Sequence, residues 1–220
     1  MKAVELKNVS KKYGSRTILE NVSFSVEKGE MVSLIGPSGC GKSTLLNMIG
    51  VLEEHDSGEI IILGKKLPSI ESKKATLLRR NTINYLFQSY ALISDMTVWQ
   101  NLFLAMNFLD ISKKRKIEKI NEVLTKIGIL SLKNEMVNTL SGGEQQRVAL
   151  ARTILKPGEL VLADEPTGSL DAVSAENVFG LIQNLCKQYK KTVIMVTHSR
   201  ELAERTDRII DLKDFEVGIK

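Results

Sequence analysis

The stretch Gly36-Pro37-Ser38-Gly39-Cys40-Gly41-Lys42-Ser43 fits the pattern GxxxxGK[ST] and carries the strongest local signal in the chain. An apolar run at residues 31–35 precedes it, and a helical pattern that opens at Thr44 follows it. A glycine-rich loop between a strand and a helix turns backbone N–H groups and a helix N-terminus toward phosphate oxygens. We therefore expect residues 36–44 to bind a nucleotide, with Lys42 at the β- and γ-phosphates and Ser43 as a ligand of Mg²⁺. A plain glycine-rich turn before a helix is the alternative, and a chance match to the pattern is expected in about one of a hundred chains of this length.

Two carboxylates follow a second apolar run. Residues 160–163 lead directly into Asp164 and Glu165. If this run is a parallel strand of the same sheet, its carboxyl end lies beside the phosphate loop. We expect Asp164 to hold Mg²⁺, through water, and Glu165 to polarise the attacking water. Two acids after a strand can also form a turn or a helix cap, and the phosphate loop is what favours the catalytic interpretation.

Apolar patterns of two kinds predict an α/β fold. Residues 31–35, 160–163 and 193–196 are apolar on both faces, and each leads into a helical pattern, which is typical of parallel strands covered by helices. Near the N-terminus, alternation predicts two antiparallel strands, one with Val4, Leu6 and Val9 and one with Val22, Phe24 and Val26. We expect a mostly parallel core sheet flanked by helices, with an N-terminal antiparallel β subdomain.

The middle of the chain predicts an inserted, all-helical subdomain. No strong strand pattern occurs between residues 89 and 155, and helices are expected at 98–109, 113–127 and 144–155. Thr97 with Gln100 and Ser141 with Glu144 have the spacing of capping boxes. The 220 residues fit one domain, in which residues 1–88 and 156–220 form the core and residues 89–155 the helical subdomain.

Composition is that of an ordinary globular domain, with 43% hydrophobic and 26% charged residues. The net charge of +5 suits nucleic acid, an anionic membrane surface or a polyphosphate equally well. Cys40 and Cys186 match no metal-site spacing and indicate a reducing compartment. No apolar run approaches the ~18 residues that a membrane span needs. We therefore expect a cytoplasmic protein that reaches the membrane only through a partner.

A third motif separates the remaining nucleotide-hydrolysing classes. Leu140-Ser141-Gly142-Gly143-Glu144-Gln145-Gln146-Arg147 resembles the signature of the ABC ATPase superfamily. The resemblance covers nearly the whole chain in the order of that family. It implies that Tyr13 stacks on adenine, that Gln88 is the glutamine of the Q-loop, and that His198 is the switch histidine. It also implies a D-loop at Ser169-Leu170-Asp171. Taken singly, each of these residues could be an ordinary core or surface residue.

The resemblance implies a mechanism that needs two subunits. Two domains pack head to tail, so that ATP on one phosphate loop is covered by the partner's Ser141, Gly142, Gly143 and Glu144. Gln88 contacts Mg²⁺ and water, His198 contacts the γ-phosphate, and Asp171 crosses toward the partner. Glu144 stands where the family usually has glutamine, which changes the electrostatics near the γ-phosphate.

The segment that contains the two carboxylates points to a subgroup. Asp164-Glu165-Pro166-Thr167-Gly168 resembles ATPases of lipoprotein release, macrolide export and peptide-antibiotic or bacteriocin export. The expected partners are a second copy of the ATPase and a membrane permease, and no nucleic acid. A soluble ABC ATPase of DNA repair or translation is the alternative, but the 53 residues from Gln88 to Ser141 (141 − 88) suit a transporter better. A small-molecule kinase would leave the signature and His198 unexplained.

Aromatic residues concentrate between residues 85 and 108, where we expect the dock for the permease. Six of the chain's eleven aromatics lie there, and Asp95 is the only charge between residues 89 and 109. A helix-in-groove contact would use such apolar anchors. The residues expected to be exposed are Tyr90, Leu92, Ile93 and Met96. Packing inside the helical subdomain is the alternative explanation of the same composition.

Overall fold

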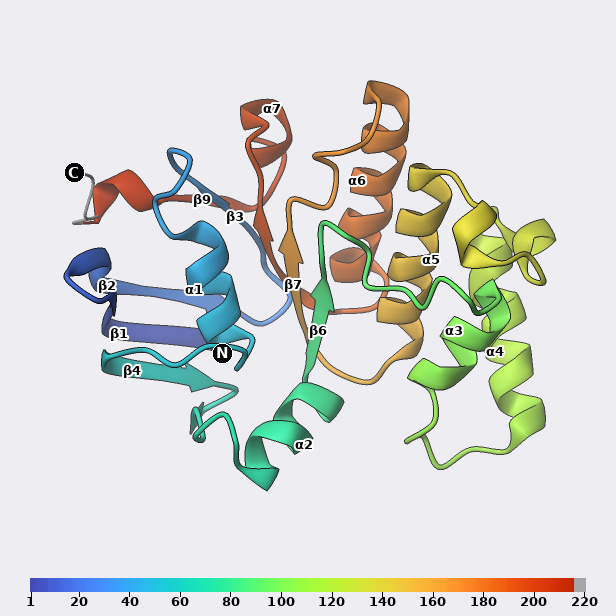
Figure 1. Cartoon of the computed structure of the whole chain (residues 1–220), viewed down its shortest axis with the longest axis horizontal. Helices are drawn as coiled ribbons and strands as arrows, with labels where there is room; N and C mark the ends of the chain where they lie inside the picture. Colours follow the sequence, from blue (N-terminus) through green and yellow to red (C-terminus); the bar gives the residue numbers. More distant parts are fainter. Residues whose placement is uncertain (216–220) are drawn as a thin grey trace.

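The strands of residues 1–215, which the computed structural model describes, form two sheets (Figure 1). The larger sheet has the order β6-β7-β8-β3-β9, and every neighbouring pair in it is parallel. Its strands are β3 (Met31–Ile35), β6 (Ile83–Leu86), β7 (Leu160–Asp164), β8 (Thr192–Val196) and β9 (Arg208–Asp211). The expected parallel core is confirmed, and the carboxyl ends of its strands meet at one edge. Residues 216–220 of the expected core lie outside the described residues.

The smaller sheet is antiparallel and has the order β2-β1-β4-β5. Its strands are β1 (Lys2–Tyr13), β2 (Arg16–Glu27), β4 (Ser57–Ile62) and β5 (Lys65–Lys66). The alternation seen in the sequence faces inward as expected, because Val4, Leu6, Val9 and Val22 are all buried. The N-terminal antiparallel part of the fold is therefore also confirmed.

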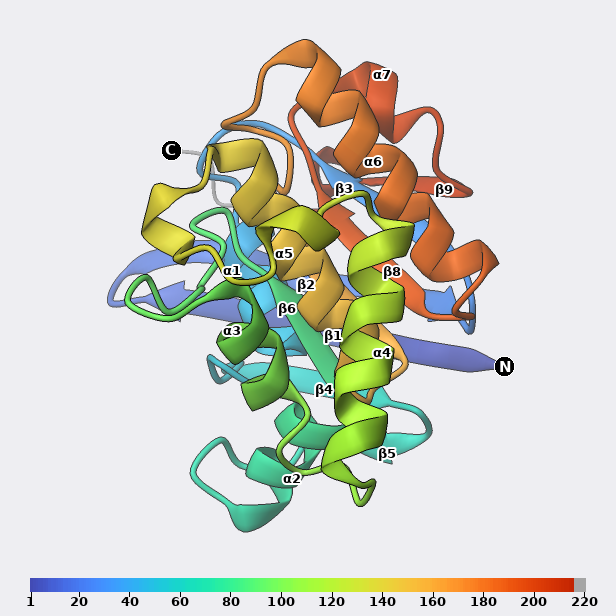
Figure 2. The same ribbon diagram turned by 90° about the vertical axis from the view of Figure 1, so that its right-hand side faces the viewer.

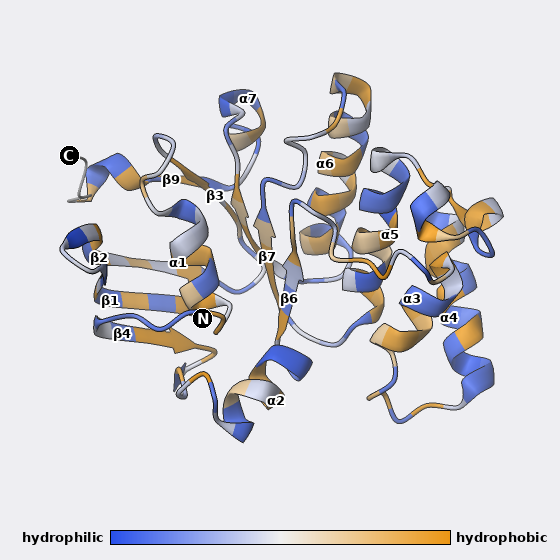
Figure 3. Ribbon diagram, viewed as in Figure 1, coloured by the Kyte–Doolittle hydropathy of each residue, from blue (hydrophilic) through white to orange (hydrophobic). Residues whose placement is uncertain are grey.

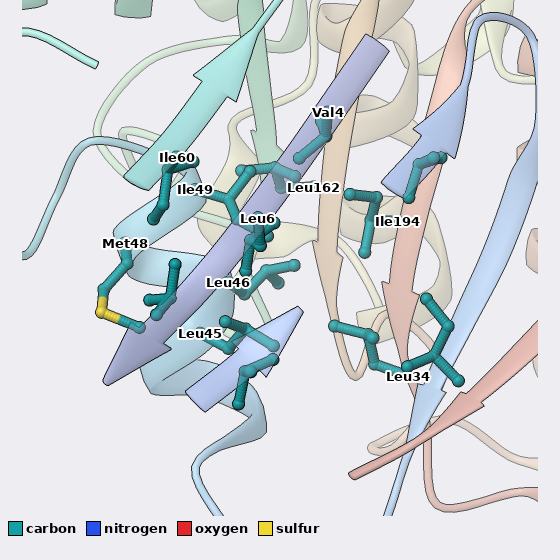
Figure 4. Packing of buried hydrophobic residues seen from close by; sticks show 14 of the residues in the cluster. Val4, Leu6, Leu34, Leu45, Leu46, Met48, Ile49, Ile60, Leu162 and Ile194 are labelled. Carbon is teal, nitrogen blue, oxygen red and sulfur yellow. The ribbon is translucent and has the colours of Figure 1, made fainter. Parts of the chain in front are cut away.

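Helix α1 (Lys42–Ile49) joins the two sheets through one apolar core. Its residues Leu45, Leu46, Met48 and Ile49 are fully buried. Figure 4 shows these side chains together with Val4, Leu6 and Ile60 of the antiparallel sheet and Leu34, Leu162 and Ile194 of the parallel sheet. Burial of a large apolar side chain contributes roughly 1.5–3 kcal/mol. The core thus fixes the position of α1 and of the phosphate loop that precedes it.

Of the remaining helices, two pack on the other side of the parallel sheet and two more pack on one of these (Figure 2). They are α3 (Val98–Ala105), α4 (Lys113–Lys126), α5 (Gly142–Leu155) and α6 (Ala172–Lys187), with the short α2 (Lys73–Asn81) and α7 (Arg200–Ala203) at the margins. Helices α3, α4 and α5 share an apolar cluster, and the outer face of α4 is hydrophilic (Figure 3). Three 3₁₀ turns complete the described fold, at Leu130–Leu132, Val137–Thr139 and Leu212–Asp214. No helix within residues 1–215 is both long and apolar enough to cross a bilayer.

Helix α3 is shorter than the sequence pattern predicted. It ends at Ala105 instead of residue 109. Asn107 is a poor helix former, and Phe108 lies with its ring 3.7 Å from the guanidinium carbon of Arg80. Contact with α2 therefore takes the place of the last helical turn. Both capping boxes, by contrast, form as expected at Thr97 and Ser141.

Candidate functional site

The phosphate loop joins the carboxyl end of β3 to α1 and has a conformation that requires glycine. Gly41 precedes the helix with φ 93°, which is a left-handed conformation. A Cβ atom there would lie 2.8 Å from Cγ2 of Ile18, so a side chain would also be excluded sterically. The following backbone N–H groups belong to the first turn of α1 and have no acceptor within the helix. The loop therefore presents donors at a helix N-terminus, as phosphate binding needs.

Lys42 lies within the loop, and its side chain is mostly buried. Its relative exposure is 5%, and Nζ donates to the carbonyl oxygens of Gly36 at 3.0 Å and Pro37 at 2.9 Å. The ammonium group is thus placed on the concave side of the loop. Cys40 is buried in the apolar core, so its side chain packs behind the loop and only its backbone can face a ligand.

The predicted meeting of the loop and the acidic pair occurs at Ser43 and Asp164. Ser43 Oγ donates to Asp164 Oδ1 at 3.1 Å, which joins the first turn of α1 to the end of β7. Burial raises the pKa of Asp164 above its usual value, and the hydrogen bond from Ser43 opposes that shift. A hydroxyl and a carboxylate oxygen side by side form a donor set that suits Mg²⁺.

Glu165 and His198 form the second pair at this edge. His198 Nε2 lies 2.7 Å from Glu165 Oε1, and the two residues follow the neighbouring strands β7 and β8. Glu165 has φ 46°, an uncommon backbone conformation for a residue with a side chain. Its N–H donates to the carbonyl oxygen of Val196 at 3.1 Å, which holds that conformation. The carboxylate is thereby aimed along the sheet edge toward His198.

Gln88 and Tyr13 border this edge from two directions. Gln88 is exposed and lies two residues beyond the end of β6, whose last residue pairs with Ala163 of β7. Tyr13 ends β1, is 50% exposed, and its hydroxyl is hydrogen bonded to Glu53. That bond raises the pKa of the Tyr13 hydroxyl, and the side chain of Thr44 opposes the shift. An exposed ring at this position is available for stacking.

The signature segment caps helix α5. Ser141 Oγ accepts from the N–H of Glu144 at 3.4 Å, and the N–H of Ser141 donates to Glu144 Oε2 at 2.8 Å. Ser141 Oγ also donates to Glu144 Oε2 at 2.7 Å. These bonds lower the pKa of Glu144, so the carboxylate is ionised and completes the cap. Glu144 thus completes the capping box that the sequence predicted.

The D-loop lies against the signature segment of the same chain. Asp171 caps α6 by accepting from the N–H groups of Val173 and Ser174 at 3.1 and 3.0 Å. A Cβ added at Gly142 would meet Tyr90 Oη at 2.9 Å and Leu170 at 3.7 Å. Figure 1 shows α5 and α1 on opposite sides of the parallel sheet. The structure therefore brings Lys42, Ser43, Asp164, Glu165 and His198 together, and places Ser141 to Glu144 on a different part of the molecule.

Three of the four expected docking residues are more buried than the sequence suggested. Tyr90 and Leu92 pack against the core between the parallel sheet and α6, and Met96 is also half-buried. Ile93 is the one expected member of this group that is exposed, at 41%. It lines a groove of about 560 Å³ between α2, α3 and α5, together with Phe87, Leu104, Phe108, Arg79 and Arg152. The aromatic segment serves both the core and this groove.

Sequence reasoning missed Arg152. Its guanidinium donates to the carbonyl oxygen of Tyr90 at 2.9 Å and to that of Ala91. Burial lowers the pKa of this arginine. The only local signal was a charged residue on an otherwise apolar stretch of α5, and nothing in the spacing connects it to Tyr90, 62 residues earlier.

Comparisons with known proteins agree with this geometry. The profile of the family described as "ABC transporter" matches residues 19–168. The bacitracin export ATP-binding protein BceA of Halalkalibacterium halodurans is 35% identical over 99% of this chain and 87% of its own length. The macrolide export ATP-binding/permease protein MacB of Pasteurella multocida is 36% identical over 97% of this chain and 33% of its own length. The chain thus spans about a third of the length of the macrolide-export relatives it matches.

Solved structures of ABC transporter cassettes are similar to nearly the whole chain. The dimeric structure of MJ0796, a bacterial ABC transporter cassette, has a TM-score of 0.87 at 38% identity and covers 98% of this chain and 97% of that one. A dimeric post-hydrolysis state of the same cassette, bound to ADP and Pi, has a TM-score of 0.86 at 37% identity with the same coverage.

Proposed function

The chain belongs to the ABC transporter family, and from this premise we propose that it is the ATP-hydrolysing subunit that drives a separate membrane permease. The observation that carries the proposal is the pair of contacts at one sheet edge, Ser43 with Asp164 and Glu165 with His198. We treat residues 1–88 and 156–220 as the core of one domain and residues 89–155 as its helical signature subdomain.

The nucleotide is held by the loop and positioned by charge. In this proposal the N–H groups at residues 36–44 bind the phosphates, Lys42 neutralises the β- and γ-phosphates, and Tyr13 stacks on adenine. Ser43 and Asp164 would hold Mg²⁺, with Gln88 beside it; Mg²⁺ takes few protein ligands and completes its shell with water and phosphate oxygens. When bound, the ion would neutralise charge that develops on the phosphates. Catalysis by such a site is mainly positioning and charge stabilisation.

Glu165 is the residue we assign to water activation. Its carboxylate follows β7 and is held in place by its backbone bond to β8 and by the contact with His198. A water that donates to Glu165 would be aimed at the γ-phosphate. His198 would then contact the γ-phosphate itself and keep the carboxylate oriented.

The second half of the site comes from another copy of the chain. Ser141 and the N–H groups of Gly142 and Gly143 stand at the N-terminus of α5. This helix terminus favours a negatively charged group, and in a head-to-tail dimer it would close over the partner's γ-phosphate. The two solved MJ0796 structures are both dimeric, which supports a site shared by two chains. Asp171 lies on the same face and would contact the partner.

The groove between α2, α3 and α5 is the proposed dock for the permease. Its floor and rim combine Phe87, Ile93, Leu104 and Phe108 with basic side chains. An amphipathic segment would bury its apolar face there. The subunit would thus lie at the cytoplasmic face of the membrane. By likeness to the bacitracin and macrolide exporters, the cargo class is a peptide antibiotic, bacteriocin, lipoprotein or drug.

Phosphate release by the purified chain tests the proposal. Wild-type protein should hydrolyse ATP only when Mg²⁺ is present, and EDTA should abolish the activity. At low protein concentration the rate per chain should rise with protein concentration, because two chains form each site. A rate per chain that is constant from the lowest concentration upward, or no hydrolysis at all, would contradict the proposal. The alternative of a soluble repair or translation ATPase has no support in the relatives found.

A further inference from the structure

Tyr90 occupies a strained and firmly held position between the Q-loop and the signature helix. It lies two residues after Gln88, and both Tyr90 and Ala91 have positive φ, at 62° and 49°. Consecutive left-handed residues that carry side chains persist only where the surroundings impose them. Here Arg152 of α5 imposes this conformation, because it donates to the carbonyl oxygens of both residues.

The Tyr90 hydroxyl touches both segments that would face a partner's nucleotide. Tyr90 Oη and Ser169 Oγ of the D-loop are hydrogen bonded at 3.1 Å. A Cβ atom at Gly142 would lie 2.9 Å from Tyr90 Oη, so the start of α5 packs directly on this hydroxyl. One side-chain oxygen therefore sets the spacing between the D-loop and the signature segment.

We propose that Tyr90 is a positioning residue that holds the signature segment and the D-loop of its own chain in register, and so acts on the ATP bound by the partner chain. The inference rests on the dimer of the proposed function. It predicts an effect in trans: removal of the hydroxyl should slow the site to which the chain donates Ser141 and Asp171. The chain's own phosphate-loop site should be unaffected.

Removal of the Tyr90 hydroxyl should change the rate of ATP hydrolysis and not the folding of the chain. Ser169 is exposed, so its hydroxyl can bond to water when the Tyr90 hydroxyl is removed. The tyrosine ring stays packed in the core beside α6. Loss of one hydrogen bond corresponds to about a 3- to 10-fold change in an equilibrium or a rate. Here the D-loop and the signature segment would be held less firmly, and the hydrolysis rate would fall by that factor.

Mixed dimers with one active site test the direction of the effect. Two differently tagged chains are combined, and one of them, the donor, carries Glu165→Gln. Hydrolysis is then confined to the phosphate loop of the other chain, the acceptor, which receives the donor's signature and D-loop. Single-turnover release of phosphate at saturating Mg·ATP is the readout. Tyr90→Phe in the donor should lower that rate about 3- to 10-fold, and in the acceptor it should leave the rate within about twofold.

The controls separate this effect from general damage. Ser169→Ala in the donor should give the same slowing, and the donor with both substitutions should be no slower than either. Tyr189→Phe, which removes a hydroxyl at the far end of α6, should change nothing. Three results would overturn the inference. The first is an equal rate for donors with and without Tyr90→Phe, both carrying Glu165→Gln. The others are slowing only when Tyr90→Phe is in the acceptor, and additive effects of Tyr90→Phe and Ser169→Ala. If the mixed dimer whose only substitution is Glu165→Gln in the donor fails to hydrolyse ATP, the proposed function fails and this inference falls with it.

Discussion

Ser141 has a structural role and a proposed catalytic role that one substitution can separate. Its side chain caps α5, and loss of such a cap costs roughly 1 kcal/mol of stability. A donor that acts on the transition state is worth about 10²-fold in rate. We expect Ser141→Ala to melt only slightly lower than wild type while its hydrolysis rate falls about 10²-fold.

Ser112 provides a matched control for this prediction. It caps α4 by accepting from the N–H of Arg115, the bond that Ser141 makes with the N–H of Glu144, but without a reciprocal side-chain bond. Ser112→Ala should therefore lose similar stability and keep full ATPase activity. If Ser141→Ala destabilises the protein as Ser112→Ala does and hydrolyses ATP at the wild-type rate, the signature serine is a cap and nothing more.

Lys191 gives a pH dependence whose sign is fixed by burial. Its Nζ donates to the carbonyl oxygens of Lys156 and Gly158, and burial, followed by the charge of Lys156, lowers the pKa of Lys191 to about 8 from 10.5. Between these values the unfolded chain binds more protons than the folded chain. The free energy of unfolding therefore rises with pH across this window. Lys191→Met should remove part of that rise, on the order of 2 kcal/mol between pH 8 and 10.

Urea unfolding at pH 8 and at pH 10 measures this difference. Other groups titrate in the same range. The informative quantity is therefore the change in the free energy of unfolding from pH 8 to pH 10 in wild type, compared with the same change in Lys191→Met. Parallel pH profiles for wild type and Lys191→Met would show that Lys191 is not shifted by its surroundings.

Part of the site could be foreseen from single residues. The contact between Ser43 and Asp164 follows from two apolar runs that end in polar residues, because parallel strands end at one edge. Tyr90 and Arg152 could not be foreseen, since their contact depends on the packing of α5 against the segment after β6. Periodicity gives the inner face of each helix but not which distant backbone carbonyl its polar residues will meet.

The segment between β6 and α3 can be divided by experiment into core and docking residues. Leu92 packs against two apolar clusters, whereas Ile93 is exposed in the groove. Leu92→Asp should destabilise the isolated domain by about 3 kcal/mol or more, because it buries a charge. Ile93→Asp should leave folding and ATP binding of the isolated domain intact but weaken its association with the permease.

Leu77 supplies the control for the docking prediction. It is 50% exposed on α2 and lies outside the residues that line the groove. Leu77→Asp should retain the permease, as measured by co-purification with the membrane subunit. If Ile93→Asp also co-purifies at the wild-type level and transport stays coupled to hydrolysis, the dock lies elsewhere on the surface.

At the level of elements, the sequence predicted whether a segment is a helix or a strand better than it predicted where the segment ends. The runs that became β3, β7 and β8 and the helix starts at Thr97 and Ser141 carry their own local signals. The end of α3 does not, because it depends on the contact of Phe108 with Arg80 of α2. The order β6-β7-β8-β3-β9 is likewise set by long-range packing and is not readable from periodicity.

At the scale of the whole chain, the two halves of the proposed site lie on separate parts of the fold. The phosphate loop precedes α1, and Glu165 follows β7 at the carboxyl edge of the parallel sheet. The signature segment lies at the start of α5, on the other side of the sheet (Figure 1). One chain can therefore bind ATP but should not by itself enclose it. Enclosure by a second copy is the central claim of the proposed mechanism.

Glu165→Gln tests that claim most directly. The amide keeps the shape of the side chain but cannot act as a general base, whose loss costs typically 10²-fold or more in rate. ATP should then bind, fail to turn over, and hold two chains together. Gel filtration with light scattering should show the 24.5 kDa chain as a monomer without nucleotide and as a particle of twice that mass with Mg·ATP. A monomer under both conditions, or a variant that hydrolyses ATP within about threefold of the wild-type rate, would contradict the account.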